Sequence, residues 1–313
     1  MLHEAVYYIP LGTSSAPSSV QCLLCPHKCV IADGGAGRCR VRINYGGTLY
    51  AGTYGLVSSL ALDPIEKKPF AHYYPGSFIL SAGNYGCNLS CLFCQNHAIS
   101  QTGGPFLDGC LLADEGGRLP DDGVIDEEGS AASERLVQTA LRERENGNIG
   151  IAFTYNEPLV GYEFVRDTVM LSRKADLKNV LVTNGYINSE PLEALLPYID
   201  AMNIDLKAFT ENFYHKICAG HLEPVLETIS RSAPRCHVEI TTLVIPGRNS
   251  SPSEIDSLSA WIASISPDIP LHLNRHHPAY KMKEPAPIMN GELFALAEIA
   301  RTHLHNVHCG NVQ

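Results

Sequence analysis

Short apolar runs alternate with longer amphipathic stretches from about residue 77 to the end of the chain. The apolar runs are bounded by Gly, Pro, Asn or Asp, which is typical of buried strands. These predicted strands are 78–82, 149–154, 179–183, 201–206, 237–245 and 271–274. The stretches with helical periodicity include 134–145, 159–173, 190–196, 252–265 and 292–303.

Strands that alternate with helices indicate right-handed β-α-β units and therefore a parallel sheet. We predict an α/β fold in which residues 76–313 form a partial (β/α)6 barrel, because about six such units are present. A doubly wound open sheet produces the same periodicity, so the pattern alone leaves that alternative open.

Two segments depart from this pattern. Residues 1–75 are rich in Gly, Ser, Pro and Cys, show little helical periodicity, and carry six basic against four acidic residues. We predict a small Cys-rich module there. Residues 108–134 carry nine acidic side chains against Arg118 alone, which predicts a solvated, mobile surface insertion, with a functional lid as the alternative.

Composition excludes several classes of protein. The chain has no run of eighteen apolar residues, so we expect no membrane span. Its first residues lack the basic and apolar regions of an export signal, which favours a cytoplasmic protein. A net charge of −10 argues against a nucleic-acid-binding surface. With 45% apolar and 18% charged residues, we expect a globular chain.

Eleven cysteines in a chain without an export signal point to metal or redox chemistry more than to disulfides. Cys87, Cys91 and Cys94 follow the first predicted strand with the spacing Cys-x3-Cys-x2-Cys. Four thiolates would fully ligate an iron–sulfur cubane, whereas three leave one iron open to a ligand. The alternatives are closure of the cluster by Cys110 or by an N-terminal cysteine, or a zinc site completed by His97.

A second cysteine group lies in the N-terminal module, with spacing typical of a four-thiolate zinc or iron–sulfur loop. Its members are Cys22, Cys25, Cys29 and Cys39. A group of thiols without metal is the alternative. The basic side chains among them could attract an acidic flavodoxin or ferredoxin as reductant. These are Lys28, Arg38, Arg40 and Arg42. The four remaining cysteines, Cys110, Cys218, Cys236 and Cys309, are scattered along the chain, and we expect most of them to be buried structural residues.

The segment 83–96, with Phe93 as the aromatic residue before the last cysteine, resembles the cluster loop of the radical S-adenosyl-L-methionine (SAM) superfamily. Segments 63–69, 75–77, 155–158 and 276–282 look like the radical SAM component of the AmmeMemoRadiSam system. That group is similar to glycyl-radical-enzyme activases such as the pyruvate formate-lyase activating enzyme.

The resemblance implies a 4Fe-4S cluster whose open iron binds SAM, and reductive cleavage of SAM to methionine and a 5′-deoxyadenosyl radical. It further implies hydrogen abstraction from a glycine of a partner protein or from a small molecule, with AmmeMemoRadiSam proteins as partners. The alternative is a non-enzymatic iron–sulfur electron-transfer or assembly protein with a fully ligated cluster.

Polar residues at the ends of the second and third predicted strands are candidate cofactor ligands. Pro158 fixes Glu157 at a strand-to-helix junction. The resemblance implies that this carboxylate accepts a hydrogen bond from the SAM ammonium group, and a simple helix-terminal acid is the alternative. The activases have Gly-Gly-Glu here, so Asn156 is a departure. Thr183 and Asn184 end the third strand in a loop that comes close to the ligand.

The fourth predicted strand carries opposite charges on one face. Asn203, Asp205 and Lys207 alternate with apolar residues, and two charges facing an interior are costly unless they pair or bind a ligand. The resemblance implies that Lys207 binds the SAM carboxylate while Asp205 orients it; an ordinary buried ion pair is the alternative. The apolar turn 243–247 can cover one face of an adenine, with Gly247 allowing close approach. The resemblance implies that His276 lies near the adenosine or the substrate. An ordinary turn and a structural histidine are the respective alternatives.

Overall fold

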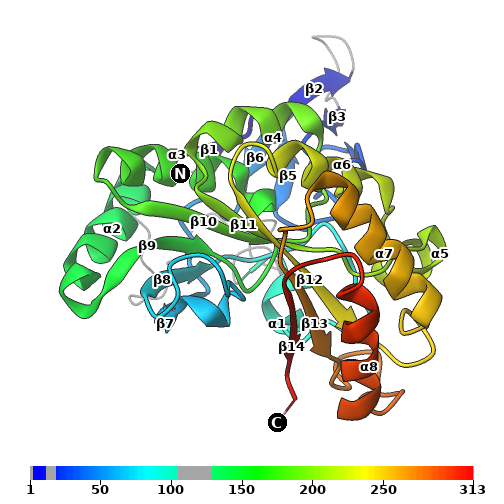
Figure 1. Cartoon of the computed structure of the whole chain (residues 1–313). Coiled ribbons are helices and arrows are strands. Elements are labelled where there is room, and N and C mark those ends of the chain that lie inside the picture. Colours follow the sequence, from blue (N-terminus) through cyan, green and yellow to red (C-terminus); the bar gives the residue numbers. More distant parts are fainter. Residues whose placement is uncertain (1–2, 12–18, 105–128, 313) are drawn as a thin grey trace.

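The computed structural model describes residues 3–11, 19–104 and 129–312. Its largest sheet has eight strands in the order β14-β13-β12-β11-β10-β9-β8-β7 (Figure 1). Strands β8 to β14 run parallel, and β7 is antiparallel to β8. The strands are β7 (Ser59–Pro64), β8 (Phe78–Gly83), β9 (Asn148–Phe153), β10 (Lys178–Thr183), β11 (Ala201–Asp205), β12 (His237–Val244), β13 (Leu271–Arg275) and β14 (Val307–Gly310).

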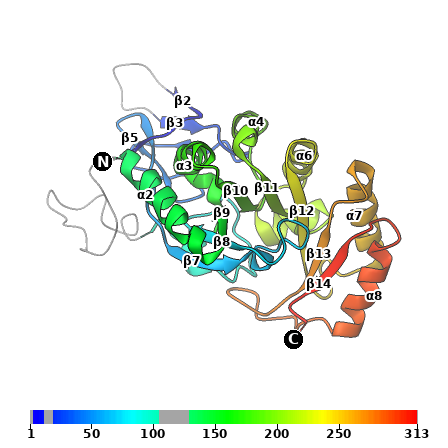
Figure 2. The same cartoon turned by 60° about the vertical axis from the view of Figure 1, so that its left-hand side comes forward.

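Helices connect successive parallel strands, because a parallel pair needs a crossover. In Figure 2 the helices α3, α4, α6, α7 and α8 follow one another along one side of the sheet in chain order. The longer helices are α2 (Gly129–Arg142), α3 (Tyr162–Lys174), α4 (Ser189–Leu195), α6 (Glu223–Ser232), α7 (Pro252–Ile265) and α8 (Asn290–Ala300). Two short helices, α1 (His97–Ser100) and α5 (Glu211–Phe213), lie near the cysteine loop and after β11 respectively.

The predicted α/β fold with a mostly parallel sheet is confirmed. All six predicted strands are present as β8 to β13, with ends that differ by a single residue. The helix predicted at 252–265 has those bounds, because Ser251 caps it through Glu254 N and Pro252 fits its first turn. Strands β7 and β14 were not predicted. β14 reads Val-His-Cys-Gly, and such a short, partly polar run carries little strand signal.

The N-terminal residues form two small antiparallel sheets. Their orders are β1-β6-β5 and β2-β3-β4. The strands are β1 (His3–Glu4), β2 (Tyr8–Leu11), β3 (Ser19–Cys22), β4 (Val30–Ile31), β5 (Arg42–Tyr45) and β6 (Thr48–Ala51). Strand β7, which also precedes residue 75, pairs with β8 of the large sheet. Most of the predicted insertion 108–134, including Cys110, lies outside the described residues.

A buried ion pair joins the N-terminal sheets to α3. Arg42 in β5 donates from Nη1 and Nη2 to the two carboxylate oxygens of Glu163 in α3, each at 2.9 Å. Val6 N also donates to Glu163 Oε1 at 2.8 Å. The side chains of Arg42 and Glu163 are 1% and 0% exposed. The prediction that Arg42 belongs to a basic docking surface is therefore wrong, since its charge is neutralised inside the protein.

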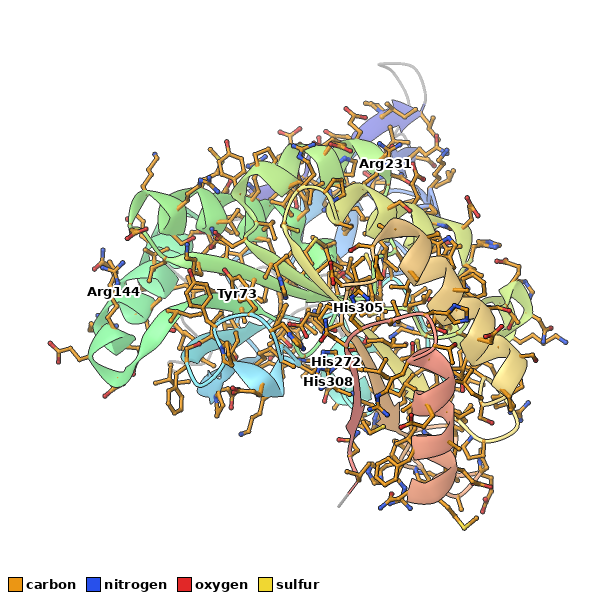
Figure 3. All side chains as sticks on the ribbon, in the orientation of Figure 1. Tyr73, Arg144, Arg231, His272, His305 and His308 are labelled. Carbon is orange, nitrogen blue, oxygen red and sulfur yellow. The ribbon has the colours of Figure 1, made fainter. Side chains whose placement is uncertain are left out.

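The segment between β7 and β8 contacts β12 and β14 of the large sheet. The buried carboxylate of Glu239 in β12 accepts hydrogen bonds from Ala71 N at 3.0 Å, His72 N at 2.9 Å and His272 Nε2 at 2.6 Å. The Nε2 atoms of His72 and His308 lie 2.9 Å apart. His272 and His308 are stacked neighbours on β13 and β14 (Figure 3). These contacts tie the loop after β7, at one end of the sheet, to β14 at the other.

Candidate active site

A cavity of about 360 Å³ lies at the carboxyl ends of the parallel strands. Carboxyl ends of parallel strands meet at one edge of a sheet, and ligands bind there in barrel-like and doubly wound folds. Strands β8 to β13, or the residues that follow them, all contribute to its wall. The lining residues are Lys67, Lys68, Pro69, Cys87, Cys91, Phe93, Cys94, Gln95, Asn96, Ser100, Thr154, Tyr155, Asn156, Glu157, Val182, Thr183, Asn184, Asp205, Lys207, Thr241, Leu243, Asn274 and Asn311.

The loop that carries the three cysteines follows β8 and is fixed by backbone hydrogen bonds. Ser90 N donates to Cys218 O at 2.8 Å, and Leu92 N donates to Ile217 O at 3.0 Å. Both acceptors belong to a π-helix turn, Tyr214–Cys218. The loop begins at Gly86, whose φ is +82°, a conformation that glycine adopts without strain. The three thiols thus face the cavity from a backbone that is already ordered.

The surroundings of the three thiols differ. Burial raises the pKa of Cys87 and Cys94, and the carboxyl group of Glu157 adds to the rise at Cys87. The pKa of Cys91 is lowered, chiefly because the thiol of Cys218 hydrogen-bonds to it. Cys218 is buried, as predicted, but its contact with Cys91 was not expected.

The three cysteines are not grouped as a preformed single-ion site. Within the described residues, no three His, Cys, Asp or Glu side chains are grouped so as to hold one metal ion. A cubane cluster keeps its cysteine sulfurs farther apart than one ion does, and the triad borders a cavity with room for more than an ion. His97, the alternative zinc ligand, instead stacks on Tyr280 with ring centroids 4.5 Å apart and does not line the cavity.

Glu157 is buried at the centre of a hydrogen-bond network between β9 and β10. Its Oε1 accepts from Thr183 Oγ1 at 2.7 Å, and its Oε2 accepts from Asn184 N at 2.7 Å. Leu159 N also donates to Oε1 at 3.0 Å, so Glu157 caps the helical turn that follows as well as lining the cavity. Burial outweighs these donors and raises the pKa of Glu157 to about 7. A cationic ligand beside it would favour the ionised form.

Asp205 and Lys207 form an ion pair on the cavity wall. Lys207 Nζ lies 2.8 Å from Asp205 Oδ2, and both side chains face the cavity, as the period-two pattern predicted. Burial alone lowers the pKa of Lys207, but Asp205 and the thiols of Cys91 and Cys218 outweigh it and raise that pKa. Lys207 is therefore a permanent cation between the cysteine loop and Asp205.

Asn156 and Asn184 use their side chains to hold the loops around the cavity. Asn156 Nδ2 donates to Gly86 O at 2.9 Å, while its Oδ1 accepts from Asn84 N at 3.0 Å. Asn184 Nδ2 donates to Asn88 Oδ1 at 2.9 Å and lies 3.5 Å from Cys87 Sγ. Both residues line the cavity, and both connect the cysteine loop to the neighbouring strands.

Two predicted site residues lie outside the cavity wall. Gly247 is exposed in the turn after β12, with φ of +68°, and His276 follows β13. Neither lines the cavity. The imidazole of His276 is fully buried, and within the described part of the chain neither ring nitrogen has a hydrogen-bond partner. Burial of an imidazole without hydrogen bonds reduces the stability of the fold, so a functional contact of this side chain would explain its position.

Lys68 and Tyr155 also line the cavity, and together with Asp63 they form a charged, hydrogen-bonded cluster that we did not predict from the sequence. Lys68 Nζ and Tyr155 Oη donate to the same oxygen of Asp63, at 2.7 and 2.8 Å. The Lys68 ammonium also lies 4.6 Å from the centre of the Tyr155 ring. These residues fall within the segments 63–69 and 155–158 that carried the family resemblance, and this was the only signal for them in the sequence.

The donor set fits an iron–sulfur cluster with a bound zwitterion. Three thiols border a cavity whose walls hold three lysines, Lys207 among them, and the carboxyl groups of Asp205 and Glu157. These are partners for iron, for a carboxylate and for an ammonium group.

Comparisons with known proteins agree with this chemistry. Residues 83–257 match the family model described as the Radical SAM superfamily. An uncharacterized protein of Methanocaldococcus jannaschii is 38% identical over 315 residues, which span 99% of this chain and 86% of that protein. The 4-hydroxyphenylacetate decarboxylase activating enzyme of Clostridioides difficile is 23% identical over 134 residues, 41% of this chain and 42% of that enzyme.

A solved structure shows a similar fold. The structure of SuiB from Streptococcus suis bound to the precursor peptide SuiA has a TM-score of 0.51 and 13% sequence identity, and the match covers 72% of this chain and 47% of that protein. None of the described helices is both long and apolar enough to cross a membrane. The family match, which covers more than half of the chain and contains the three-cysteine loop, shows that this protein belongs to the Radical SAM superfamily.

Proposed function

We propose that this chain is an activase-like radical SAM enzyme that abstracts a hydrogen atom from a glycine of a partner protein. The observation that carries the proposal is the arrangement around the cavity. Cys87, Cys91 and Cys94 lie at one side, and the Asp205–Lys207 pair and Glu157 complete the wall. A purely electron-transferring protein has no need for a cavity of about 360 Å³ beside its cluster ligands.

The residues divide into cluster ligands and SAM ligands. The three loop cysteines would hold a 4Fe-4S cluster with one open iron. Lys207, kept cationic by Asp205, suits the SAM carboxylate, and Glu157 suits the ammonium group. When bound and reduced, the cluster and SAM supply methionine and a 5′-deoxyadenosyl radical that removes a hydrogen atom from the substrate.

Other residues support these ligands. Thr183 and Asn184 orient Glu157, and Asn156 fixes the start of the cysteine loop. We place His276 toward the adenosine or the substrate because its buried imidazole has no partner within the described residues. Gly247, exposed in the turn after β12, is assigned to the adenine side of the site.

The proposal also covers the architecture and the partners. We treat residues 76–313 as a partial (β/α)6 barrel and residues 1–75 as a Cys-rich module. A flavodoxin or ferredoxin would supply the electron, and Lys28 and Arg38 are exposed for such an acidic partner. The similarity to an activating enzyme supports a protein glycine as hydrogen donor, and a small molecule is the second candidate. The family resemblance places the partner among AmmeMemoRadiSam proteins.

Anaerobic incubation of the iron- and sulfide-reconstituted protein with SAM and dithionite tests the reaction class. We expect 5′-deoxyadenosine and methionine in equal amounts. A Cys91→Ala variant should yield neither, while Cys236→Ala, which changes a cysteine far from the cavity lining, should match the wild type. Failure of the reconstituted wild type to form 5′-deoxyadenosine, with an EPR spectrum unchanged by SAM, would favour an electron-transfer protein with a closed cluster.

A further inference from the structure

The four N-terminal cysteines surround one small pocket. Cys22 ends β3, Cys25 and Cys29 lie in the turn before β4, and Cys39 precedes β5. All four border the same pocket. They come together from a span of eighteen positions in a module that has little helix and only short strands.

One of the four sulfur atoms accepts a backbone hydrogen bond: Arg38 N donates to Cys29 Sγ at 3.4 Å. Neutral thiols are weak acceptors and need no such donors, whereas a metal-bound thiolate is a charged acceptor that N–H groups stabilise. The hydrogen bond from Arg38 N lies where a metal-bound thiolate of Cys29 would accept it.

The pocket between the four cysteines is small. The space open to a water molecule in it is about 10 Å³, close to the minimum that holds one water. Four cysteine ligands with a closed coordination sphere are typical of structural zinc. The thiols are not yet grouped as tightly as an ion requires, so binding would turn their side chains inward.

The pocket lies directly behind the loop that carries Cys87, Cys91 and Cys94. His27, between two of the four cysteines, has its Nε2 2.7 Å from Asn88 O in that loop. A Cβ at Gly86 would lie 2.6 Å from Cys39 O, so the two backbones are in contact there. Movement of the N-terminal turn would therefore displace the cysteine loop.

We propose that Cys22, Cys25, Cys29 and Cys39 bind one zinc ion, which holds His27 and Cys39 against the cysteine loop and so positions it. The loop's role as a cluster carrier comes from the proposed function, but the zinc site itself does not depend on it.

Metal analysis of the purified full-length chain tests the site. We expect one zinc per chain in the wild type, its loss in Cys22→Ser and Cys39→Ser, and its retention in the control Cys236→Ser. Protein produced with Co²⁺ in place of zinc should show the visible absorption of tetrahedral cobalt–thiolate, and Cys39→Ser should not. Wild-type protein without zinc, or with four additional irons that Cys39→Ser removes, would overturn the proposal.

A second set of variants distinguishes failure of the zinc proposal from failure of the proposed function and from misfolding of a cysteine variant. A Cys87→Ala, Cys91→Ala, Cys94→Ala triple variant should retain one zinc although it forms no cluster. Its loss of zinc would overturn the assignment of the site to the N-terminal cysteines. His27→Phe keeps all four cysteines, so it should retain zinc but release iron to a chelator several-fold faster than the wild type. An unchanged rate of iron release would overturn the positioning role.

Discussion

The ion pair between Arg42 and Glu163 makes a strong prediction about stability. The variant Glu163→Gln removes one charge from a pair whose side chains are 1% and 0% exposed. The amide keeps one acceptor for Val6 N and Arg42, but its NH₂ group then faces a guanidinium N–H that has lost its acceptor. Loss of one partner from a buried pair costs about 3–5 kcal/mol, and we expect the lower end of this range because one acceptor remains.

Urea unfolding followed by circular dichroism measures the change in the free energy of unfolding. The matched variant is Arg42→Met combined with Glu163→Leu, which removes both charges. Because replacing a whole buried pair by apolar side chains is often close to neutral, we expect it to be more stable than Glu163→Gln alone. A loss below about 1 kcal/mol for Glu163→Gln, or a double variant as unstable as the single one, would refute this view of how the N-terminal sheets are attached.

Three further variants test other parts of the structure. Burial alone raises the pKa of Glu239, but hydrogen bonds from two histidines and two backbone amides outweigh it and lower that pKa, so this carboxylate stabilises the fold above its ordinary pKa of 4.5 and loses that contribution as the pH falls. Glu239→Gln should therefore flatten the pH dependence of unfolding below 4.5, and an unchanged acid profile would count against it. Gly86→Ala places a Cβ against Cys39 O at a φ of +82°, so it should cost at least roughly 1–3 kcal/mol in urea unfolding, and a neutral result would contradict the close approach. Cys218→Ala should keep four irons and a SAM-dependent EPR change, whereas loss of iron would make Cys218 a fourth cluster ligand.

Much of the fold follows from local sequence signals. Short, largely apolar runs separated by stretches with helical periodicity predicted β8 to β13. Strand β7 was not predicted. It is an antiparallel edge strand in which even Leu60 is about half exposed, so it lacks the pattern of a buried strand. Arg42 was misassigned because its partner Glu163 is 121 positions away, and nothing near Arg42 indicates that it is buried.

The candidate site shows the same division. The cysteine spacing and the alternation of Asp205 and Lys207 are local patterns, and the structure places these residues on one cavity wall. The contact between Asp63 and Tyr155 joins positions 92 residues apart, so only the folded chain reveals it. Cys218 was treated as an ordinary buried cysteine because its approach to Cys91 depends on the π-helix turn.

That turn has a consequence for the order of assembly. Its carbonyl groups accept hydrogen bonds from Ser90 N and Leu92 N. The cysteine loop therefore loses its conformational entropy when the polypeptide folds, before any cluster is inserted. Iron and sulfide then bind to a loop whose backbone is already in place. A newly synthesised chain needs no rearrangement of this backbone when the cluster is inserted.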